Sequence, residues 1–237
     1  MSSSAAPEPE QVQQIFDRIA PVYDALNDWL SFGQHRIWKK MAVRWSNPQP
    51  GQKFLDLCCG SGDLAIMLAR RIGSTGEVVG VDFSCQQLAT AAQRLEALPQ
   101  LANRITWQEG DALRLEFPDR SFDGATMAYG LRNVINIPLC LTELQRVLKP
   151  GSIAAILDIN RPQDSIASSF QQWYLGKVVV PIAKMQGLSE EYAYIAPSLE
   201  RFPTAPEQEK LAIDAGFQQA KHYSIANGLM GILVLKS

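Results

Sequence analysis

Two glycines and one carboxylate are the residues of this sequence whose spacing most clearly indicates chemistry. Gly60 and Gly62 follow an apolar stretch at 54–58 that is typical of a short buried strand, and apolar residues at helical spacing come after them. Glycines at such a turn let a ligand approach the backbone closely. Asp82 ends a second apolar stretch about twenty residues later, where nucleotide-binding folds accept hydrogen bonds from ribose hydroxyls. The pattern therefore predicts a nucleoside site, with Asp82 as its ribose contact.

The residues missing from this turn narrow the choice of ligand. A dinucleotide site needs a third glycine three residues after Gly62, but Ala65 occupies that position, and the phosphate-binding pattern G-x-x-x-x-G-K-[ST] does not occur. The segment from Asp56 to Gly62, D-x-x-x-G-x-G, instead resembles motif I of the class I methyltransferases. Their cofactor, S-adenosylmethionine, has no phosphate, so the resemblance makes it the expected cofactor here.

The elements around the turn alternate between strands and helices, which predicts an α/β fold with a mostly parallel sheet and helices on both faces. The expected strands are 54–58, 77–82, 104–108, 122–128 and 153–159, and the expected helices are 63–72, 85–97 and 138–148. A helix at 206–216 then precedes two strands, 218–225 and 230–236, joined through Asn227-Gly228, a hairpin signal. We therefore expect a class I, Rossmann-like sheet of seven strands that ends in an antiparallel hairpin.

The chain reads as one methyltransferase domain, 11–237, behind a flexible N-terminus, 1–10. Apolar residues within 164–188 favour a buried or pocket-lining segment, with a shallow membrane contact as the alternative. The expected parts of the domain are a helical cap at 11–50, a cofactor-binding core at 51–160, a helical substrate-pocket insertion at 161–205, and a C-terminal helix and hairpin at 206–237.

Composition argues against several classes of function. The 237 residues carry a net charge of -2 without basic blocks, which disfavours a nucleic-acid partner. The first residues do not resemble a signal or transit peptide, and no apolar run approaches the roughly 20 residues of a membrane span, so we expect a cytoplasmic protein. The four cysteines lack metal-ligand spacing, so we expect no metal site, and Cys58 and Cys59 should pack as small residues.

Polar residues follow the third and fourth expected strands of the core. Asp111 and the backbone of Ala112 are placed to contact an adenine amino group, although an ordinary turn aspartate is an equally good interpretation. Arg132 and Asn133 could stabilise and orient an anionic substrate oxygen, and a salt-bridged structural loop is the alternative.

The two histidines are weaker candidates for catalysis. His35 could act as a general base if the cap folds over the site, but a surface or helix-capping role is favoured. His222 lies in an expected C-terminal strand, where a structural role is favoured.

A longer set of motifs resembles the UbiE/MenG family, the C-methyltransferases of ubiquinone, menaquinone and phylloquinone biosynthesis. The resemblance extends from about residue 12 to the end of the chain. Its motifs are FDRIA at 16–20 with Tyr23-Asp24, LDLCCGSGDLA at 55–65, GDA at 110–112, FPDRSFD at 117–123, YGLRNV at 129–134, RVLKPG at 146–151 and RFP at 201–203.

The resemblance implies roles for individual residues. Arg132, Asn133 and Tyr23 are the expected catalytic residues. The expected cofactor-binding residues are Asp56, Gly60, Ser61, Gly62, Asp82, Phe83, Asp111, Ala112 and Tyr129.

The Cys-Cys pair and Gln34-His35-Arg36 resemble the phylloquinone branch of this family. The implied reaction is methylation of ring carbon 3 of 2-phytyl-1,4-naphthoquinone, as the quinol. A demethylmenaquinone or ubiquinone-pathway enzyme, and a non-catalytic S-adenosylmethionine- or quinone-binding module, remain alternatives. A prenylated substrate implies peripheral contact with a thylakoid or plasma membrane, and the sequence leaves the oligomeric state open, with a homodimer among the alternatives.

Overall fold

A seven-stranded sheet forms the centre of the computed structural model, which describes residues 33–161, 177 and 195–237. The strand order is β3-β2-β1-β4-β5-β7-β6. Neighbours among the first five strands pair in parallel, whereas β7 pairs antiparallel with both β5 and β6. The predicted mixed sheet with a C-terminal antiparallel hairpin is therefore confirmed. The strands are β1 (Lys53–Leu57), β2 (Glu77–Asp82), β3 (Ile105–Glu109), β4 (Phe122–Ala128), β5 (Leu148–Ile159), β6 (Gln219–Ile225) and β7 (Met230–Lys236).

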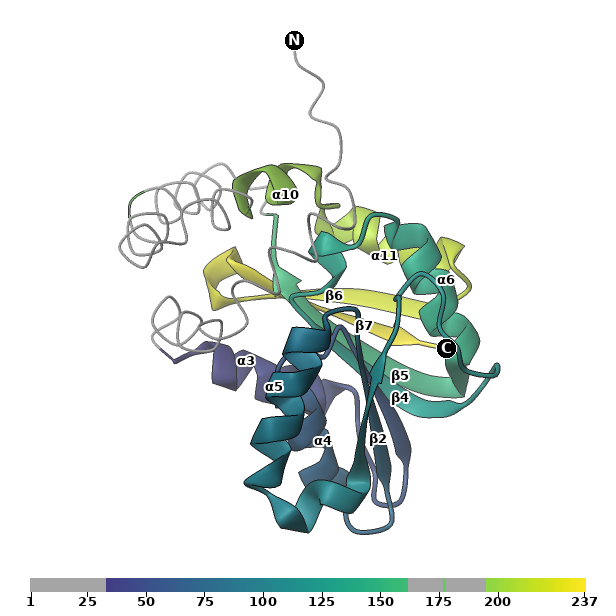
Figure 1. Cartoon of the computed structure of the whole chain (residues 1–237). Helices are drawn as coiled ribbons and strands as arrows, with labels where there is room; N and C mark the ends of the chain where they lie inside the picture. Colours follow the sequence, from purple (N-terminus) through teal and green to yellow (C-terminus); the bar gives the residue numbers. More distant parts are fainter. Residues whose placement is uncertain (1–32, 162–176, 178–194) are drawn as a thin grey trace.

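Helices cover both faces of this sheet (Figure 1). The first face carries α3, α4 and α5, and the second carries α6 and α11, while α10 lies near the carboxyl ends of the strands. The helices are α3 (His35–Trp45), α4 (Asp63–Ile72), α5 (Cys85–Glu96), α6 (Ile137–Val147), α10 (Ile195–Arg201) and α11 (Ala205–Asp214), with short 3-10 turns η1 (Pro99–Arg104), η2 (Leu131–Asn133) and η4 (Ala226–Gly228).

The central strand β1 is apolar because both of its faces are covered. Phe54, Leu55 and Leu57 are almost completely inaccessible to solvent. Phe54 packs into the apolar cluster of α4, whereas Leu55 and Leu57 pack into the cluster that includes α6 and α11. Burial on both sides holds β1 in place between the two layers of helices. It thereby also fixes the point at which the chain leaves β1 and enters the glycine turn.

The predicted elements differ from the observed ones mainly at β5. This strand begins at Leu148 instead of residue 153, and its pairing with β4 shifts register between Phe122 and Gly124. The irregularity accommodates Pro150, which lacks a backbone donor for the ladder. Much of the predicted cap and insertion lies outside the described residues, and α3 lies in the described part of the cap.

Candidate functional site

A cavity of about 670 Å³ lies at the carboxyl ends of β1, β2, β3 and β4. Parallel strands end at one edge of a sheet, so the loops after these four strands meet there. Among the described residues, Gly62 and Arg132 are predicted site residues that do not line this cavity. Those that do are Asp56, Gly60, Ser61, Asp82, Phe83, Asp111, Ala112, Tyr129 and Asn133.

The glycine turn after β1 is held from beneath by Asp56. The Ala65 backbone N–H donates to Asp56 Oδ2 at 2.8 Å, and the Thr126 hydroxyl donates to Oδ1 at 2.9 Å. Gly62 adopts φ +83°, and a Cβ added there would lie 2.4 Å from the ring of Trp107. Both carboxylate oxygens of Asp56 therefore bond to the protein itself, which makes Asp56 a positioning residue for the turn.

Burial strongly affects the ionisable groups of this turn. It raises the pKa of Asp56 to about 7, although the hydrogen bonds from Thr126 and Ala65 favour the carboxylate. Burial also raises the pKa of the Cys58 and Cys59 thiols well above the ordinary value. Both cysteines are therefore neutral thiols at neutral pH and are poor nucleophiles.

Cys58 and Tyr129 share an unusual backbone conformation that the sequence does not reveal. They follow the neighbouring strands β1 and β4, and their φ angles are +53° and +61°. Residues with side chains adopt positive φ at a cost of about 1–3 kcal/mol, and such residues cluster at ligand sites. Both border the cavity, so the strained backbone lies at its wall.

Asp82 connects two of the loops that form the cavity. Its Oδ2 accepts the Gly60 N–H at 2.8 Å, and its Oδ1 accepts the Ser84 N–H at 3.0 Å. Ser84 in turn caps α5 by accepting the Gln87 N–H. The predicted ribose residue thus orders the glycine turn and the start of α5, and it does so at the cavity wall beside Phe83.

Asp111 combines the two roles that the sequence left open. Its Oδ1 accepts the Leu113 N–H at 2.9 Å, as a turn aspartate does, and it also lines the cavity. Ala112 lies beside it in the lining. An adenine placed at the end of β3 would meet these two residues.

The polar side chains of the loop after β4 line two different cavities. Tyr129 and Asn133 line the large cavity, and the Asn133 amide donates to the Tyr129 carbonyl at 2.9 Å. The amide oxygen of Asn133 is buried without a hydrogen-bond partner in the described part of the chain. A buried acceptor without a donor costs stability, so this oxygen is suited to bond a ligand.

Arg132 lies on the other side of the loop, in a smaller cavity of about 300 Å³. Its side chain is 8% exposed, its Nε lies 3.4 Å from Asp158 Oδ1, and its Nη1 donates to Ser198 Oγ at 2.5 Å. The backbone N–H of Arg132 also donates to Asp158 Oδ2, at 3.0 Å. Asn133 borders both cavities, so the predicted Arg-Asn pair stands at the junction between them.

A cluster of charged residues that the sequence analysis did not identify also borders the large cavity, through Lys39 and Asp63. Asp63, the first residue of α4, accepts from the Lys39 ammonium at 2.6 Å and from the Arg94 guanidinium, which also donates to Ser61 Oγ. Burial alone would raise the pKa of Asp63, but the two cations outweigh it and lower the pKa to about 2. The sequence did contain a signal for Lys39. It lies four residues from both His35 and Val43, a spacing that places all three side chains on one face of a helix, and this face of α3 is buried.

Neither described histidine contributes to the cavity lining. His35 is the first residue of α3 and is buried, so the surface alternative of the favoured surface or helix-capping role was wrong; its spacing from Val43 on the buried face of the helix explains the difference. His222 lies on β6, where its ring packs against Gly231 of β7. The third predicted catalytic residue, Tyr23, lies outside the described residues.

Residues 33–161, 177 and 195–237 contain no group of three or more His, Cys, Asp or Glu side chains arranged to hold a metal ion. None of their helices combines the length and apolar character that crossing a bilayer requires.

Comparison with known proteins identifies the family of this chain. A 2-phytyl-1,4-naphtoquinone methyltransferase from Nostoc punctiforme is 62% identical over 226 residues, which are 95% of this chain and 97% of that protein. The chloroplastic 2-phytyl-1,4-beta-naphthoquinone methyltransferase of Arabidopsis thaliana is 52% identical and covers 93% of this chain, with 85% of its own length matched.

A solved structure gives the same fold at much lower identity. The SAM dependent methyltransferase from Aquifex aeolicus has a TM-score of 0.64 and 15% identity, covering 97% of this chain and 98% of that one. The fold is therefore that of the class I methyltransferases. The sequence pattern of the ubiE/COQ5 methyltransferase family matches residues 4–235. The chain belongs to this family of methyltransferases.

Proposed function

We propose that this protein methylates ring carbon 3 of 2-phytyl-1,4-naphthoquinone, in the quinol form, with S-adenosylmethionine as the methyl donor. The observation that carries the substrate assignment is the identity of 52–62% over nearly the whole chain to 2-phytyl-1,4-naphthoquinone methyltransferases. The substrates of the menaquinone and ubiquinone branches of the family are the alternatives.

The order and the charge of the residues that line the cavity support S-adenosylmethionine as its ligand. Adenine at Asp111 and Ala112 and ribose at Asp82 follow the order of β3 and β2, and the glycine turn after β1 comes next. Carboxylates prevail in its lining, which suits a cation, and the buried oxygen of Asn133 offers an acceptor. No phosphate-binding loop is needed, because this cofactor has no phosphate.

The chemistry needs few protein groups. When bound, the cofactor supplies a methyl group that is already electrophilic. The protein must hold the quinol ring in line with it and exclude water. A quinol oxygen that is at least partly deprotonated makes the adjacent ring carbon nucleophilic, and the ring proton leaves after the carbon–carbon bond forms.

Arg132 and Asn133 are the groups we assign to that oxygen. The Arg132 guanidinium is fixed by Asp158 and Ser198, so it is preorganised and costs little entropy to orient. Asn133 faces both cavities and can hydrogen-bond at their junction. In this proposal, the ring lies at the junction, and Tyr23 adds a further catalytic contact from outside the described residues.

The smaller cavity has the lining expected for part of an apolar substrate. Around the Arg132 side chain it presents Ile137, Pro138, Phe202 and Leu211. A polar ring substituent near Arg132, with hydrocarbon beyond it, would match this distribution.

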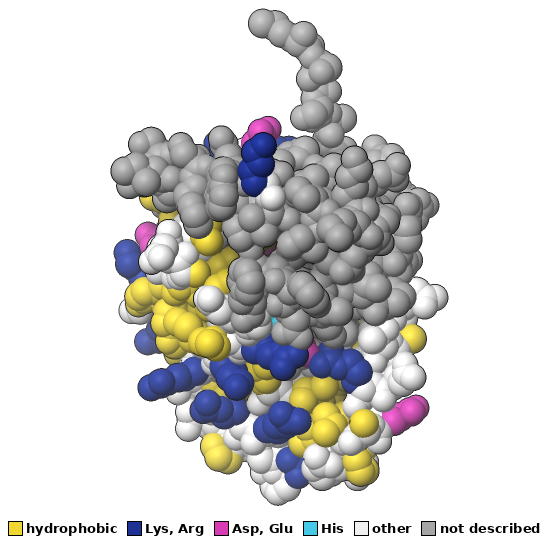
Figure 2. All heavy atoms as spheres, turned by 90° about the vertical axis from the view of Figure 1, so that its left-hand side faces the viewer, with side chains coloured by type: hydrophobic (Ala, Val, Ile, Leu, Met, Phe, Trp, Pro, Cys, Tyr) yellow, Lys and Arg dark blue, Asp and Glu magenta, His cyan; other side chains and the backbone are white. Residues whose placement is uncertain are grey.

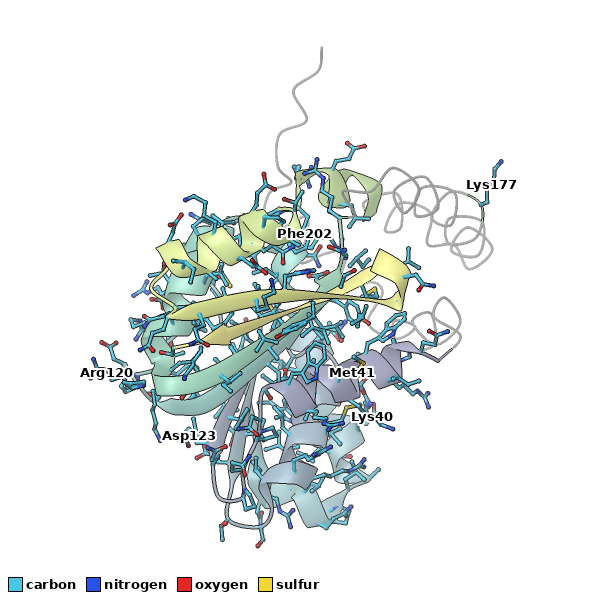
Figure 3. All side chains as sticks on the ribbon, turned by 180° about the vertical axis from the view of Figure 1, so that it is seen from behind. Lys40, Met41, Arg120, Asp123, Lys177 and Phe202 are labelled. Atoms are coloured by element: carbon cyan, nitrogen blue, oxygen red, sulfur yellow. The ribbon has the colours of Figure 1, made fainter. Side chains whose placement is uncertain are left out.

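The hydrocarbon tail of the substrate also implies a membrane surface, and α3 offers a face for one. Arg36, Lys40 and Arg44 recur every four residues along its exposed side, and Ile37, 58% exposed, lies beside them. Figure 2 shows Lys and Arg side chains gathered with hydrophobic ones on the side of the molecule where α3 lies. We propose that this side of α3, with Lys40 labelled in Figure 3, binds an anionic membrane surface reversibly.

Methyl transfer from labelled S-adenosylmethionine to 2-phytyl-1,4-naphthoquinone tests the proposed reaction. The assay is run with and without a chemical reductant, beside demethylmenaquinone and a ubiquinone precursor. Labelled phylloquinone, formed chiefly under reducing conditions, is the expected product. Faster labelling of demethylmenaquinone or of the ubiquinone precursor would assign the enzyme to the menaquinone or the ubiquinone branch. If no quinone is labelled, the protein would be a non-catalytic cofactor-binding module.

A further inference from the structure

One cation stands out in a cavity that is otherwise acidic. Among the described lining residues, Lys39 is the only Lys, Arg or His side chain. The same lining contains five carboxylates, namely Asp56, Asp63, Asp82, Glu109 and Asp111. S-adenosylmethionine carries two positive groups, the sulfonium and the ammonium, and one negative group, the carboxylate. The acidic lining attracts the sulfonium and the ammonium. Among the charged side chains of the described lining, only Lys39 attracts the carboxylate.

Lys39 is also buried to a degree that is unusual for lysine. Its side chain is 5% exposed, and its ammonium lies 5.7 Å from the centroid of the Tyr129 ring. Lysine is almost never fully buried unless it is paired, because an ammonium loses its hydration. Its hydrogen-bond acceptor among the described residues is one oxygen, Asp63 Oδ2 at 2.6 Å. An ammonium has three N–H donors, so Lys39 can serve a second acceptor.

Lys39 shares its carboxylate partner with a second cation. Asp63, which is firmly ionised, pairs with both Lys39 and Arg94, so it is not a partner of Lys39 alone. Asp56, the next carboxylate, has a pKa of about 7 and so carries only part of a charge at neutral pH. A carboxylate bound at the Lys39 ammonium would supply a negative charge that Lys39 does not have to share.

The position of Lys39 agrees with the direction of the ligand. The strands run β3, β2, β1, β4 across the cavity floor, and the proposed function places adenine and ribose at the ends of the first two. The amino-acid end of the ligand must then extend over β1 toward β4. Lys39 contacts both sides of that end, through Asp63 at the start of α4 and Tyr129 after β4.

We propose that Lys39 binds the carboxylate at the methionine end of the cofactor, so that α3 of the cap completes the cofactor site. This inference rests on the proposed use of S-adenosylmethionine. The competing role is an ion pair that only joins α3 to α4 through Asp63.

Calorimetric binding of two ligands separates these roles without an activity assay. The first is S-adenosylhomocysteine, and the second is S-adenosyl-3-thiopropylamine, which keeps the amine and lacks only the carboxylate. We expect the unmodified protein to prefer the first ligand by about 10–100-fold, the value of a charge-assisted hydrogen bond. Lys39→Met should lose most of that preference, by weakening only the first ligand. Lys39→Arg should retain part of it, and Lys40→Met, the exposed neighbour, should retain all of it.

An equal loss of affinity for both ligands in Lys39→Met, or an intact preference, would overturn the inference. Thermal melting verifies that each variant is folded, and Lys39→Gln provides the same comparison if the methionine variant is not. The unmodified protein serves as the test of the cofactor assignment itself. If it binds neither ligand, the proposed function fails; if it binds both and Lys39→Met leaves their ratio unchanged, only the Lys39 assignment fails.

Discussion

Asp158 accepts the backbone N–H of Arg132 at 3.0 Å, and its second oxygen lies 3.4 Å from Arg132 Nε. One carboxylate at the end of β5 thereby fixes both the main chain and the side chain of the loop after β4. Burial raises the pKa of Asp158, while the Arg132 guanidinium acts in the opposite direction. The pair is enclosed, so each partner depends on the other for its charge balance.

Arg132→Ala should lower the rate of quinol methylation by about 10²–10³-fold, the usual effect of removing one preorganised donor. Asp158→Asn should lower it less, since Arg132 keeps its charge but loses its orientation. Affinity for S-adenosylhomocysteine should stay within about threefold, because Arg132 lines the neighbouring cavity.

The measurements are steady-state rates and calorimetric affinities on the same samples. Arg120→Ala is the control, since Arg120 is exposed at the opposite end of the sheet, beside the start of β4 (Figure 3). A loss of cofactor affinity as large as the loss of rate would contradict the assignment of Arg132 to the substrate.

Gly62→Ala should destabilise the protein by about 3 kcal/mol, from a positive φ and overlap with the Trp107 ring. Gly151→Ala is the matched control, because Gly151 also has a positive φ, +82°, but a Cβ there meets no atom within 4 Å. It should cost about 1 kcal/mol. Urea denaturation measures both values. Equal destabilisation would show that the contact with Trp107 relaxes without cost.

Asp56→Asn should change the pH dependence of stability. An Asp56 pKa of about 7, against the ordinary 3.8, means that between these values the folded protein holds a proton that the unfolded chain has released. Stability of the unmodified protein therefore falls as pH rises through this range. Asparagine does not titrate and can keep the bonds to Ala65 and Thr126. Its stability relative to the unmodified protein should rise by roughly 2–3 kcal/mol from pH 5 to pH 8.

Asp123→Asn provides the contrast in the same urea titrations. Burial alone would raise the pKa of Asp123, but hydrogen bonds from Lys149 and the Lys53 N–H outweigh it and lower the pKa. Asp123 is thus ionised throughout pH 5–8, and its variant should differ from the unmodified protein by the same amount at both ends. Parallel curves for Asp56→Asn as well would refute the raised pKa.

The triple variant Arg36→Gln, Lys40→Gln and Arg44→Gln should bind anionic vesicles at least about tenfold more weakly, since each cation near such a surface contributes about 1 kcal/mol. Sedimentation with vesicles containing phosphatidylglycerol measures the bound fraction. High salt should release the unmodified protein, because it screens these charges.

A control variant removes the same charge from the other side of the molecule. It replaces with glutamine three lysines of α11, β6 and β7, namely Lys210, Lys221 and Lys236. Equal weakening by both variants would indicate a response to net charge and would argue against a binding face on α3.

The sheet and part of the site could be predicted from sequence because their signals are local. Gly60, Gly62 and Asp82 each end or follow an apolar strand, and parallel strands that share an edge bring those ends together. A short pattern thus fixes a position in space.

Lys39 and Arg132 could not be placed in this way. Lys39 reaches the cavity only because α3 packs against α4 and β5, a contact between segments far apart in the chain. Arg132 and Asn133 are adjacent in the 3-10 turn η2, yet Arg132 lines only the smaller cavity whereas Asn133 borders both. The spacing of residue types in the sequence predicts neither the angle at which α3 packs nor the type of turn that η2 forms.

The hairpin has a consequence for how this protein is made. The ribosome produces β7 after every other described element, yet β7 lies between β5 and β6, where it pairs along its whole length with both. The four strands below the cofactor cavity can pair earlier, since β1 to β4 need no residue beyond Ala128. Until β7 emerges, however, the outer edge of β5 is an open template for other strands, so wrong pairing at this edge is a hazard until the last described strand has been made.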